Sequence, residues 1–236
     1  QRQMCIRDSD MTLMDWLRNK ILPAEAEMNR SDHYWGAMLA AAEMIRTGTT
    51  AFADMYGPFM DVVAEVVIEA GLRGVLCRGI SGATPYGEVK LADNTALYQA
   101  YHGAGEGRVS VMYGVHALYS CPPNLMKKVA AAAQKAGAEI HIHMSETRGE
   151  VENCLKKYGK RPFAHVESTG IFDCGTLAAH CVWLDDEDIS IIKKHGIRVA
   201  HNPGSNMKLA SGVAPVPRLP VSYTHLRAHE TLRYLV

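Results

Sequence analysis

The chain has 236 residues, of which 47% are apolar and 21% are charged, a profile typical of a globular enzyme and not of a disordered chain. Lysine plus arginine equals aspartate plus glutamate at 25 each, so no basic excess points to nucleic acid or to an anionic membrane surface. None of the six cysteines forms a Cys-x-x-Cys pair, which excludes the commonest structural zinc and redox motifs and favours a reducing, cytoplasmic compartment.

Short apolar runs alternate with longer amphipathic segments along most of the chain, beginning with a helical pattern at His33–Arg46. The apolar runs predict six strands: Thr49–Met55, Leu72–Ile80, Arg108–His116, Ala138–Glu146, Gly175–Leu184 and Ile197–His201. The segments between them predict five helices: Met60–Ala70, Ala92–His102, Pro123–Ala136, Gly149–Tyr158 and Asp186–His195.

This repeated alternation of strand and helix predicts a parallel sheet with helical crossovers. An open doubly wound sheet and a (β/α)8 barrel both fit the alternation. The polar residues favour the barrel, because they lie at the C-terminal ends of predicted strands, where barrel enzymes keep their chemistry. These residues are His116, His143, Glu146, His180 and His201.

The two ends of the chain break the pattern. Residues 1–8 have no period, and the residues after 220 lack an apolar face at helical spacing and resemble translated adapter sequence. We therefore expect residues 1–8 and 220–236 to be non-native, and residues 9–219 to hold the barrel.

The strongest chemical signal is the run HIHMSE, from His141 to Glu146. His141 and His143 point to the same face of a strand, so an imidazole on an inward face could bind a metal near the rim. The Glu146 carboxylate, just past the strand end, could shuttle protons over the same site. Two polar residues on an exposed strand face are the alternative, which the burial of both faces of a parallel sheet disfavours. Taken alone, His180 and His116 are ambiguous.

Five segments in order closely resemble the methylthioadenosine/S-adenosylhomocysteine deaminase family of the amidohydrolase superfamily. They are MTLMDWLRNKILPAEAEM, IRTGTTAFADMY, HIHMSET, LAAHCVWL and HNPGSNMKLASGVAP. The resemblance covers residues 10–218. The ordered set is very specific for the wider group, which includes triazine hydrolases and guanine deaminase, and it is less specific for the substrate. It implies an α/β fold, a truncated (β/α)8 TIM-type barrel, with one divalent metal such as zinc. It also implies a hydrolase acting on C–N bonds of cyclic amidines, which converts an adenosine-type nucleoside to the inosine-type product.

The resemblance implies roles for three residues in catalysis. His143 resembles the metal-binding histidine of the fifth strand, and His141 its structural neighbour. Glu146 resembles the glutamate that protonates the purine ring nitrogen and contacts the substrate. His180 resembles the sixth-strand histidine that contacts the attacking hydroxide.

Three further residues are implied to bind the substrate. Glu25 resembles the carboxylate that binds the ribose hydroxyls, and Arg78 and His116 resemble substrate-contacting positions. From pattern alone, Glu25 is an ordinary helix residue and Arg78 a charge at a strand end. Lys90 stands where the family has an arginine near the tail of the substrate.

The chain departs from the family in its metal ligands. The family also uses a His-x-His pair on the first strand and an aspartate at the end of the eighth, and neither is present, so residues 9–219 correspond to about strands 2 to 7. A catalytic zinc needs about three protein ligands. We therefore expect this polypeptide to be inactive on its own, although the complete protein is an enzyme.

Two alternative functions stay open. One is another amidohydrolase, such as a triazine hydrolase or a guanine deaminase, and Glu25 separates it from a nucleoside deaminase because a bare heterocycle has no ribose. The other is an inactive fragment with no function of its own. The expected partner is a small-molecule nucleoside, without nucleic acid or membrane, and a homo-oligomer is left open.

Overall fold

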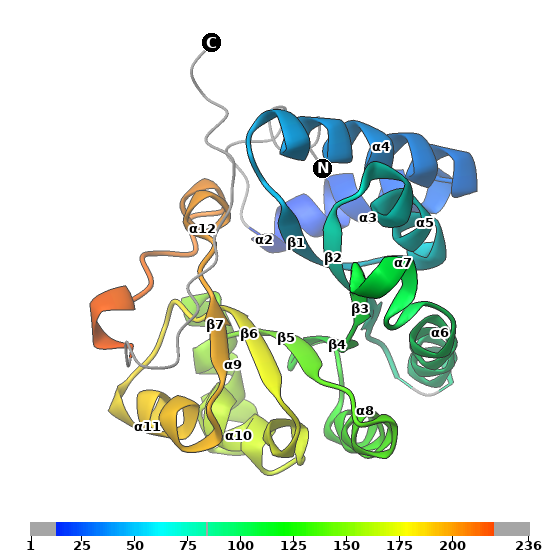
Figure 1. Ribbon diagram of the computed structural model, residues 1–236. Coiled ribbons are helices and arrows are strands. Elements are labelled where there is room, and N and C mark those ends of the chain that lie inside the picture. Colours follow the sequence, from blue (N-terminus) through cyan, green and yellow to red (C-terminus); the bar gives the residue numbers. More distant parts are fainter. Residues whose placement is uncertain (1–12, 84, 220–236) are drawn as a thin grey trace.

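Parallel strands that follow one another in chain order form the sheet of the computed structural model (Figure 1). Residues 13–83 and 85–219 are described, and the predicted non-native ends at 1–8 and 220–236 lie outside them. The strands are β1 (Ala51–Tyr56), β2 (Arg73–Ile80), β3 (Val109–Val111), β4 (Tyr113–Ala117), β5 (Ile140–Met144), β6 (Thr176–His180) and β7 (Arg198–Ala200).

Helices connect these strands and precede the first. The long ones are α4 (Arg30–Arg46), α5 (Met60–Ala70), α6 (Tyr86–Tyr101), α8 (Pro123–Ala136), α9 (Arg148–Tyr158) and α11 (Asp186–His195). The short ones are α2 (Leu13–Trp16), α3 (Leu22–Glu27), α7 (Ala104–Gly107), α10 (Pro162–Glu167) and α12 (Pro203–Lys208). A π-helical segment at Leu17–Ile21 and 3-10 turns at Ile171–Asp173 and Val216–Arg218 complete the set. None of these described helices has the length and apolar character needed to cross a membrane.

The strand order is β1-β2-β4-β5-β6-β7, with β3 also paired to β2. This confirms the predicted sequential order, and a doubly wound sheet is excluded because the order never reverses. The predicted third strand is interrupted at Met112. Leu76 pairs with Val111 before the break and Gly79 with Gly114 after it, at the same offset, so β3 and β4 form one barrel strand in two pieces.

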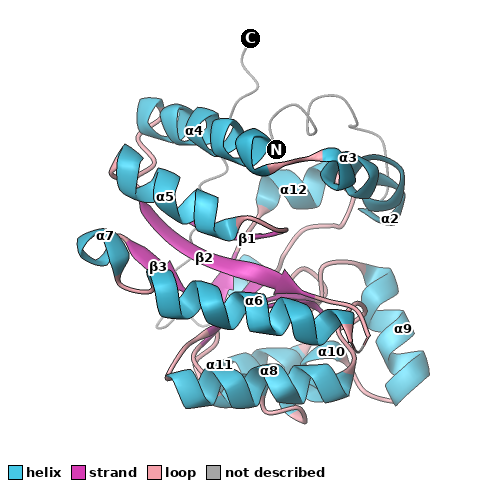
Figure 2. Ribbon diagram, turned by 90° about the vertical axis from the view of Figure 1, so that its right-hand side faces the viewer, coloured by secondary structure: helices cyan, strands magenta, loops and turns pink. Residues whose placement is uncertain are grey.

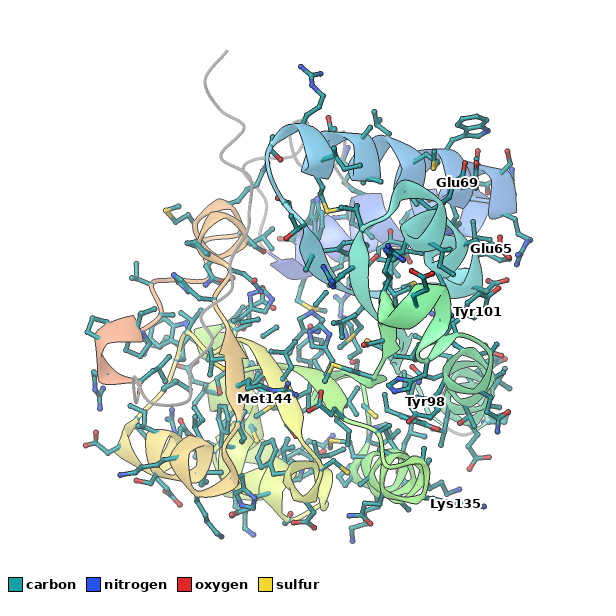
Figure 3. All side chains as sticks on the ribbon, in the orientation of Figure 1. Glu65, Glu69, Tyr98, Tyr101, Lys135 and Met144 are labelled. Carbon is teal, nitrogen blue, oxygen red and sulfur yellow. The ribbon has the colours of Figure 1, made fainter. Side chains whose placement is uncertain are left out.

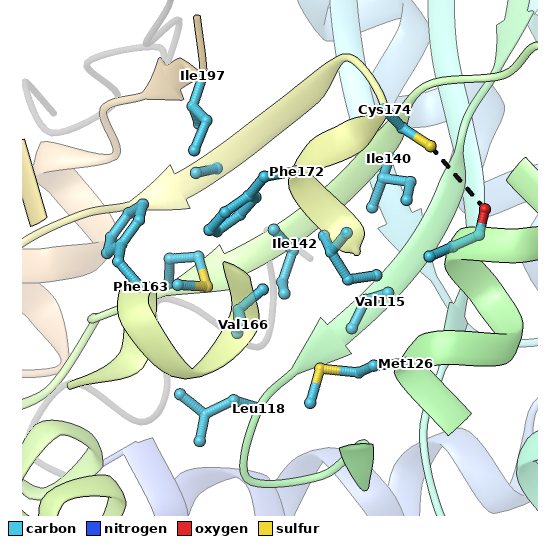
Figure 4. Close-up of a cluster of buried hydrophobic side chains, with 14 of the residues drawn as sticks. Val115, Leu118, Met126, Ile140, Ile142, Phe163, Val166, Phe172, Cys174 and Ile197 are labelled. Carbon is cyan, nitrogen blue, oxygen red and sulfur yellow. Dashed lines mark hydrogen bonds between the residues drawn. The ribbon is translucent and has the colours of Figure 1, made fainter. Parts of the chain in front are cut away.

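The sheet curls, and helices α4, α5, α6, α8, α10 and α11 follow its convex side (Figures 1 and 2). The largest apolar cluster lies between β4 to β7 and helices α8, α10 and α11 (Figure 4). Ile140, Ile142 and Met144 of β5 belong to this cluster. Because side chains alternate along a strand, His141 and His143 between them face the other, concave side.

Helix α8 shows how the sequence builds this outer layer. Its buried residues, Leu125, Met126, Val129, Ala130 and Ala133, recur at helical spacing on one face. As predicted, it begins at a proline and ends before Gly137, whose φ of 65° suits a helix stop.

Polar contacts join neighbouring outer helices (Figure 3). The Tyr101 hydroxyl of α6 donates to Glu65 of α5 at 3.1 Å, and the Tyr98 hydroxyl donates to the carbonyl of Ala136 at the end of α8, also at 3.1 Å. The outer helices are therefore linked to one another as well as to the sheet.

Candidate active site

The C-terminal ends of β4, β5 and β6 bring three histidines together. The ring centroid of His143 lies 5.4 Å from that of His116 and 5.4 Å from that of His180. Nδ1 of His143 lies 2.7 Å from the carbonyl oxygen of His116. A carbonyl oxygen can only accept, so His143 carries its proton on Nδ1 and has a free lone pair on Nε2, the form that binds a metal.

Glu146 lies beside His180 just beyond the strands. Oε2 of Glu146 is 3.8 Å from Nε2 of His180, and the two residues are only 4% and 6% exposed. Burial raises the pKa of Glu146 above its ordinary value, against the opposing effects of His143 and of a hydrogen bond from Ser211. A carboxyl group whose pKa is raised toward neutrality is suited to give and take a proton during a reaction.

The backbone at the end of β6 turns His180 toward this group. Ala178 packs in the core between sheet and helices, and strict alternation would send His180 to the same side. Instead His180 has a φ of 73° and Cys181 a φ of 49°, both left-handed. Left-handed backbone costs a non-glycine residue ~1–2 kcal/mol and is concentrated at functional sites. The Cys181 amide, which donates to the carbonyl of Met144 at 3.0 Å, holds this turn against β5.

Burial favours the neutral forms of His116 and His143. It lowers the pKa of His116 to about 4, helped by the nearby His143 and Lys90. The pKa of His143 is also lowered, by burial first and by His180 second. Neutral imidazoles offer lone pairs, so the group is arranged to bind a cation or accept hydrogen bonds.

A second cluster, at the ends of β1 and β2, contains Glu25 and Arg78, two of the predicted substrate-binding residues. The Tyr56 hydroxyl hydrogen-bonds to the half-buried Glu25 of α3. Arg78 donates from Nη1 to the carbonyl of Tyr56 at 3.2 Å, and Lys90 donates to the Ser81 hydroxyl at 2.8 Å. Burial lowers the pKa of both cations, and the charge of Glu25 opposes that effect in each.

The two clusters adjoin. The charge of Lys90 acts on His116, and the charges of Arg78 and Glu25 act on Lys90, so the second cluster lies within electrostatic range of His116. The structure therefore brings Glu25, Arg78 and His116 to the same rim as His143, Glu146 and His180.

Two further histidines that the sequence analysis named, His141 and His201, lie outside both clusters. His141 is buried behind His143, with ring centroids 5.8 Å apart, and its Nδ1 lies 3.7 Å from the Cys77 sulfur. His201, past the end of β7, is half-buried, and its Nδ1 finds no partner in the described part of the chain.

Sequence reasoning missed two residues in the segment after β7. The amide oxygen of Asn206 lies 2.8 Å from Nδ1 of His180. The Ser211 hydroxyl donates to Glu146 at 3.4 Å. Both residues belong to HNPGSNMKLASG, whose Asn-Pro and Gly-Ser pairs have the composition of an ordinary loop.

Comparison with known proteins supplies the family. A model of the Amidohydrolase family matches residues 2–221. The chain belongs to this family. Its fold is α/β and forms part of a (β/α)8 TIM-type barrel, as the sequence analysis expected.

Relatives with a known name extend this finding. The 5-methylthioadenosine/S-adenosylhomocysteine deaminase of Desulforudis audaxviator (strain MP104C) is 50% identical over 210 residues, covering 89% of this chain and 49% of that protein. The protein of the same name from Syntrophomonas wolfei is 50% identical over 211 residues, with the same coverage. The chain thus spans about half the length of the curated relatives it matches.

Solved structures agree on the fold. An adenosine deaminase from Xanthomonas campestris with bound zinc has a TM-score of 0.80 at 29% identity, covering 92% of this chain and 50% of that one. A guanine deaminase from C. acetobutylicum has a TM-score of 0.79 at 21% identity, covering 90% and 54%, a likeness that shows the fold alone.

Amidohydrolases bind a divalent metal, and His143 fits one by its tautomer and its place at the rim. Residues 13–83 and 85–219 contain no group of three or more His, Cys, Asp or Glu side chains able to hold a metal ion together. His143 therefore fits as one ligand of a metal site, and these described residues do not complete the site by themselves.

Proposed function

We propose that the protein is a metal-dependent aminohydrolase that removes the amino group from the adenine ring of an adenosine-type nucleoside. The substrate class is that of 5'-methylthioadenosine and S-adenosylhomocysteine, and the product is the inosine-type nucleoside. The observation that carries the proposal is the buried Glu146 carboxyl beside His180 and His143, in a chain 50% identical to relatives named for this deamination.

Each residue of the first cluster has a chemical task. His143 would hold a divalent metal, zinc in our proposal, which makes hydroxide available near neutral pH by lowering the pKa of water towards ~7. His180 accepts a hydrogen bond from the attacking water through Nε2 and so orients it. Glu146 gives a proton to the ring nitrogen as the water oxygen bonds to C6. Of the two protons of the water, one restores Glu146 and the other passes to the amino group, which leaves as ammonia when the bond from C6 to that nitrogen breaks.

The second cluster binds the sugar side of the substrate. The Glu25 carboxylate accepts hydrogen bonds from the ribose hydroxyls, and the neighbouring Arg78 and Lys90 charges attract it and hold it in place. His116, next to Lys90, contacts the substrate between the two clusters. A triazine or a free guanine offers no ribose to Glu25, which is why a nucleoside deaminase is preferred to these alternatives.

The proposal also covers the cellular compartment and the activity of the chain on its own. Cys77, Cys121, Cys154, Cys174 and Cys181 are all free and buried, which supports a reducing, cytoplasmic location. The 236-residue chain is expected to be inactive alone, because its described residues supply one secure metal ligand where about three are needed.

A chimera tests the proposal. Residues 10–218 replace the matching segment of the Desulforudis audaxviator enzyme, whose remaining half supplies the other barrel strands. We expect loss of adenine absorbance with 5'-methylthioadenosine, and a fall of about 100- to 10,000-fold in kcat on Glu146→Gln with metal content unchanged. Glu152→Gln, on the exposed side of α9 and paired with Arg148, is the matched control and keeps full activity.

Two outcomes would contradict the proposal. The first is turnover of guanine or a triazine without turnover of any adenosine-type nucleoside. The second is undiminished activity in the Glu146→Gln chimera, which would remove Glu146 from the reaction.

A further inference from the structure

We infer that Asn206 and Ser211 are positioning residues of the catalytic pair: Asn206 holds His180 in the tautomer protonated at Nδ1, and Ser211 holds the Glu146 carboxylate. What the pair does chemically rests on the proposed function, but the positioning itself rests on contacts between buried side chains.

The contact between Asn206 and His180 determines the tautomer. The amide oxygen of Asn206 lies 2.8 Å from Nδ1 of His180, and Asn206 is only 1% exposed. An amide oxygen can only accept, so Nδ1 must carry the proton and Nε2 must present its lone pair. That Nε2 is the atom facing Glu146, at 3.8 Å. The geometry thus directs a hydrogen-bond acceptor into the space between His180 and Glu146.

Ser211 forms three hydrogen bonds that connect the segments around this space. Its hydroxyl donates to Oε1 of Glu146 at 3.4 Å, the carboxylate oxygen that does not face His180. Its amide donates to the carbonyl of Asn206 at 2.8 Å, and its own carbonyl accepts from Nε1 of Trp183 at 2.7 Å. The segment after β7 is therefore tied to the loops after β5 and β6, and it fixes both members of the pair relative to each other.

The second polar atom of Asn206 argues against a purely structural role. Its Nδ2 is buried and has no hydrogen-bond partner within the part of the chain that the structure describes. A buried donor left unpaired costs about 1–3 kcal/mol, so an apolar residue of the same size would serve stability better. The amide is explained by what its oxygen does to His180.

Because the Asn206 amide is neutral, His180 and Glu146 have separate roles in the proposed reaction. A carboxylate on Nδ1 would favour the charged imidazolium, as in the triads of serine hydrolases, and would make the histidine a proton carrier. An amide orients the ring without adding charge. His180 then acts as an acceptor that orients water, and the proton transfer is left to Glu146.

The tautomer is measured by NMR of the side-chain nitrogens in the 236-residue chain labelled with 15N-histidine, with His180 assigned through His180→Gln. We expect Nδ1–H in the wild type, a shift of the population to Nε2–H in Asn206→Ala, and retention of Nδ1–H in Asn206→Asp, which keeps an oxygen acceptor. The control Met207→Ala, on the same helix and 69% exposed, changes nothing.

The two variants separate positioning from stability. Asn206→Asp buries an extra charge and lowers Tm, yet it keeps the proton on Nδ1, whether the ring is neutral or becomes the imidazolium that a carboxylate favours. A structural role alone would make the Nδ1 proton and Tm change together. A wild-type ring protonated at Nε2, or an Asn206→Ala chain that keeps Nδ1–H, overturns the inference.

Kinetics in the chimera give the second readout. Asn206→Ala and Ser211→Ala are expected to lower kcat about 10- to 100-fold, the usual loss for a residue that orients a ligand or a catalytic group, with little change in KM. Ser190→Ala, on the exposed side of α11, is the control for the lost hydroxyl. Unchanged kcat in both variants of an active chimera contradicts the inference. An inactive chimera counts against the proposed function, while the NMR result still decides the role of Asn206.

Discussion

Glu150 shows how a single residue supports the site without touching the substrate. Its carboxylate accepts hydrogen bonds from the backbone amides of Ser145 and Glu146, at 2.9 Å each, and it is only 6% exposed. Ser145 has a left-handed φ of 48°, so these bonds hold a strained turn immediately before the proposed proton donor. Burial raises the pKa of Glu150 to about 7, the two backbone bonds oppose that rise, and the charge of Glu146 adds to it.

The raised pKa of Glu150 predicts a pH dependence of stability. Between its ordinary pKa of 4.5 and about 7, the unfolded chain releases this proton while the folded chain keeps it. The free energy of unfolding therefore falls as pH rises through this window, by about 3 kcal/mol from this group, and is then constant with respect to it. Glu150→Gln should remove this part of the slope in urea unfolding measured from pH 4.5 to 8.

Other ionisable groups near Glu150 set the control for that measurement. Glu146, Tyr119, Cys154 and Cys181 interact with it electrostatically, and Glu146 has a raised pKa of its own. Glu152→Gln leaves all of them in place and should keep the wild-type slope. An identical slope in Glu150→Gln and wild type would show that Glu150 does not titrate in this range.

At the scale of single residues, the sequence predicts which side chains lie at strand ends better than it predicts their hydrogen-bond partners. Strand ends and family resemblance together indicated His143, Glu146 and His180, and the structure places them side by side. The contacts of Asn206 and Ser211 could not be predicted, because they depend on how the segment after β7 folds back over two other loops. The Thr147-x-x-Glu150 spacing is that of a capping box, but the Glu150 carboxylate reaches Ser145 and Glu146 instead.

At the scale of the elements, close packing between β2 and β4 depends on Gly114. A Cβ at this position would lie 2.5 Å from the Arg78 carbonyl oxygen and 2.9 Å from the Cys77 sulfur. The backbone atom cannot move away without disturbing the strand pairing that carries Arg78. The absence of a side chain at Gly114 therefore lets two strands approach beside Arg78, a proposed substrate-binding residue.

Gly114→Ala is expected to destabilise the chain by about 1–3 kcal/mol, the usual cost of overpacking a core. Gly36→Ala is the matched control, because Gly36 lies in helix α4 with no atom within 4 Å of the added Cβ, and there alanine should stabilise by about 0.5–1 kcal/mol. Urea unfolding of both variants checks the pair, and equal stabilities would contradict this account of the β2–β4 contact.

Element types were predicted well, and element boundaries less well. Helix α6 begins at Tyr86, six residues before the predicted start. The sequence did not indicate this first turn, because Pro85 and Gly87 around it have the composition of a loop. Strands β5 and β6 end at Met144 and His180, before their predicted ends, where left-handed residues break the extended backbone. Apolar runs continue past these points, so periodicity alone cannot locate them.

At the scale of the whole molecule, the parallel order of the strands gathers both clusters at one rim. The residues come from positions as far apart as Glu25 and Ser211, and only the barrel geometry brings their elements together. The sequence predicted this architecture because each strand and helix pair is a local pattern. It did not supply a complete metal site, because His143 alone was predicted as a ligand and the described residues contain no group of three or more His, Cys, Asp or Glu side chains that could hold a metal ion.

The 236-residue chain and the chimera are therefore expected to differ in the amount of zinc that they bind. With one secure ligand, the 236-residue chain should retain well under one equivalent of zinc after gel filtration, and the chimera should retain one. Atomic absorption measures both. His143→Ala should remove the zinc from the chimera, and Glu27→Ala on the exposed side of α3 should leave the zinc content unchanged. One equivalent of zinc on the chain itself would mean that its own residues complete the site.

The most direct test of the central claim follows the oxygen atom. The chimera is incubated with 5'-methylthioadenosine in water labelled with 18O, and the product is analysed by mass spectrometry. Deamination by water predicts an inosine-type product with one 18O at C6 and an intact thioether, together with released ammonia, and this product should form about 100- to 10,000-fold more slowly with Glu146→Gln. A product that keeps its 6-amino group, or one that has lost the sugar or the thioether, would contradict the account.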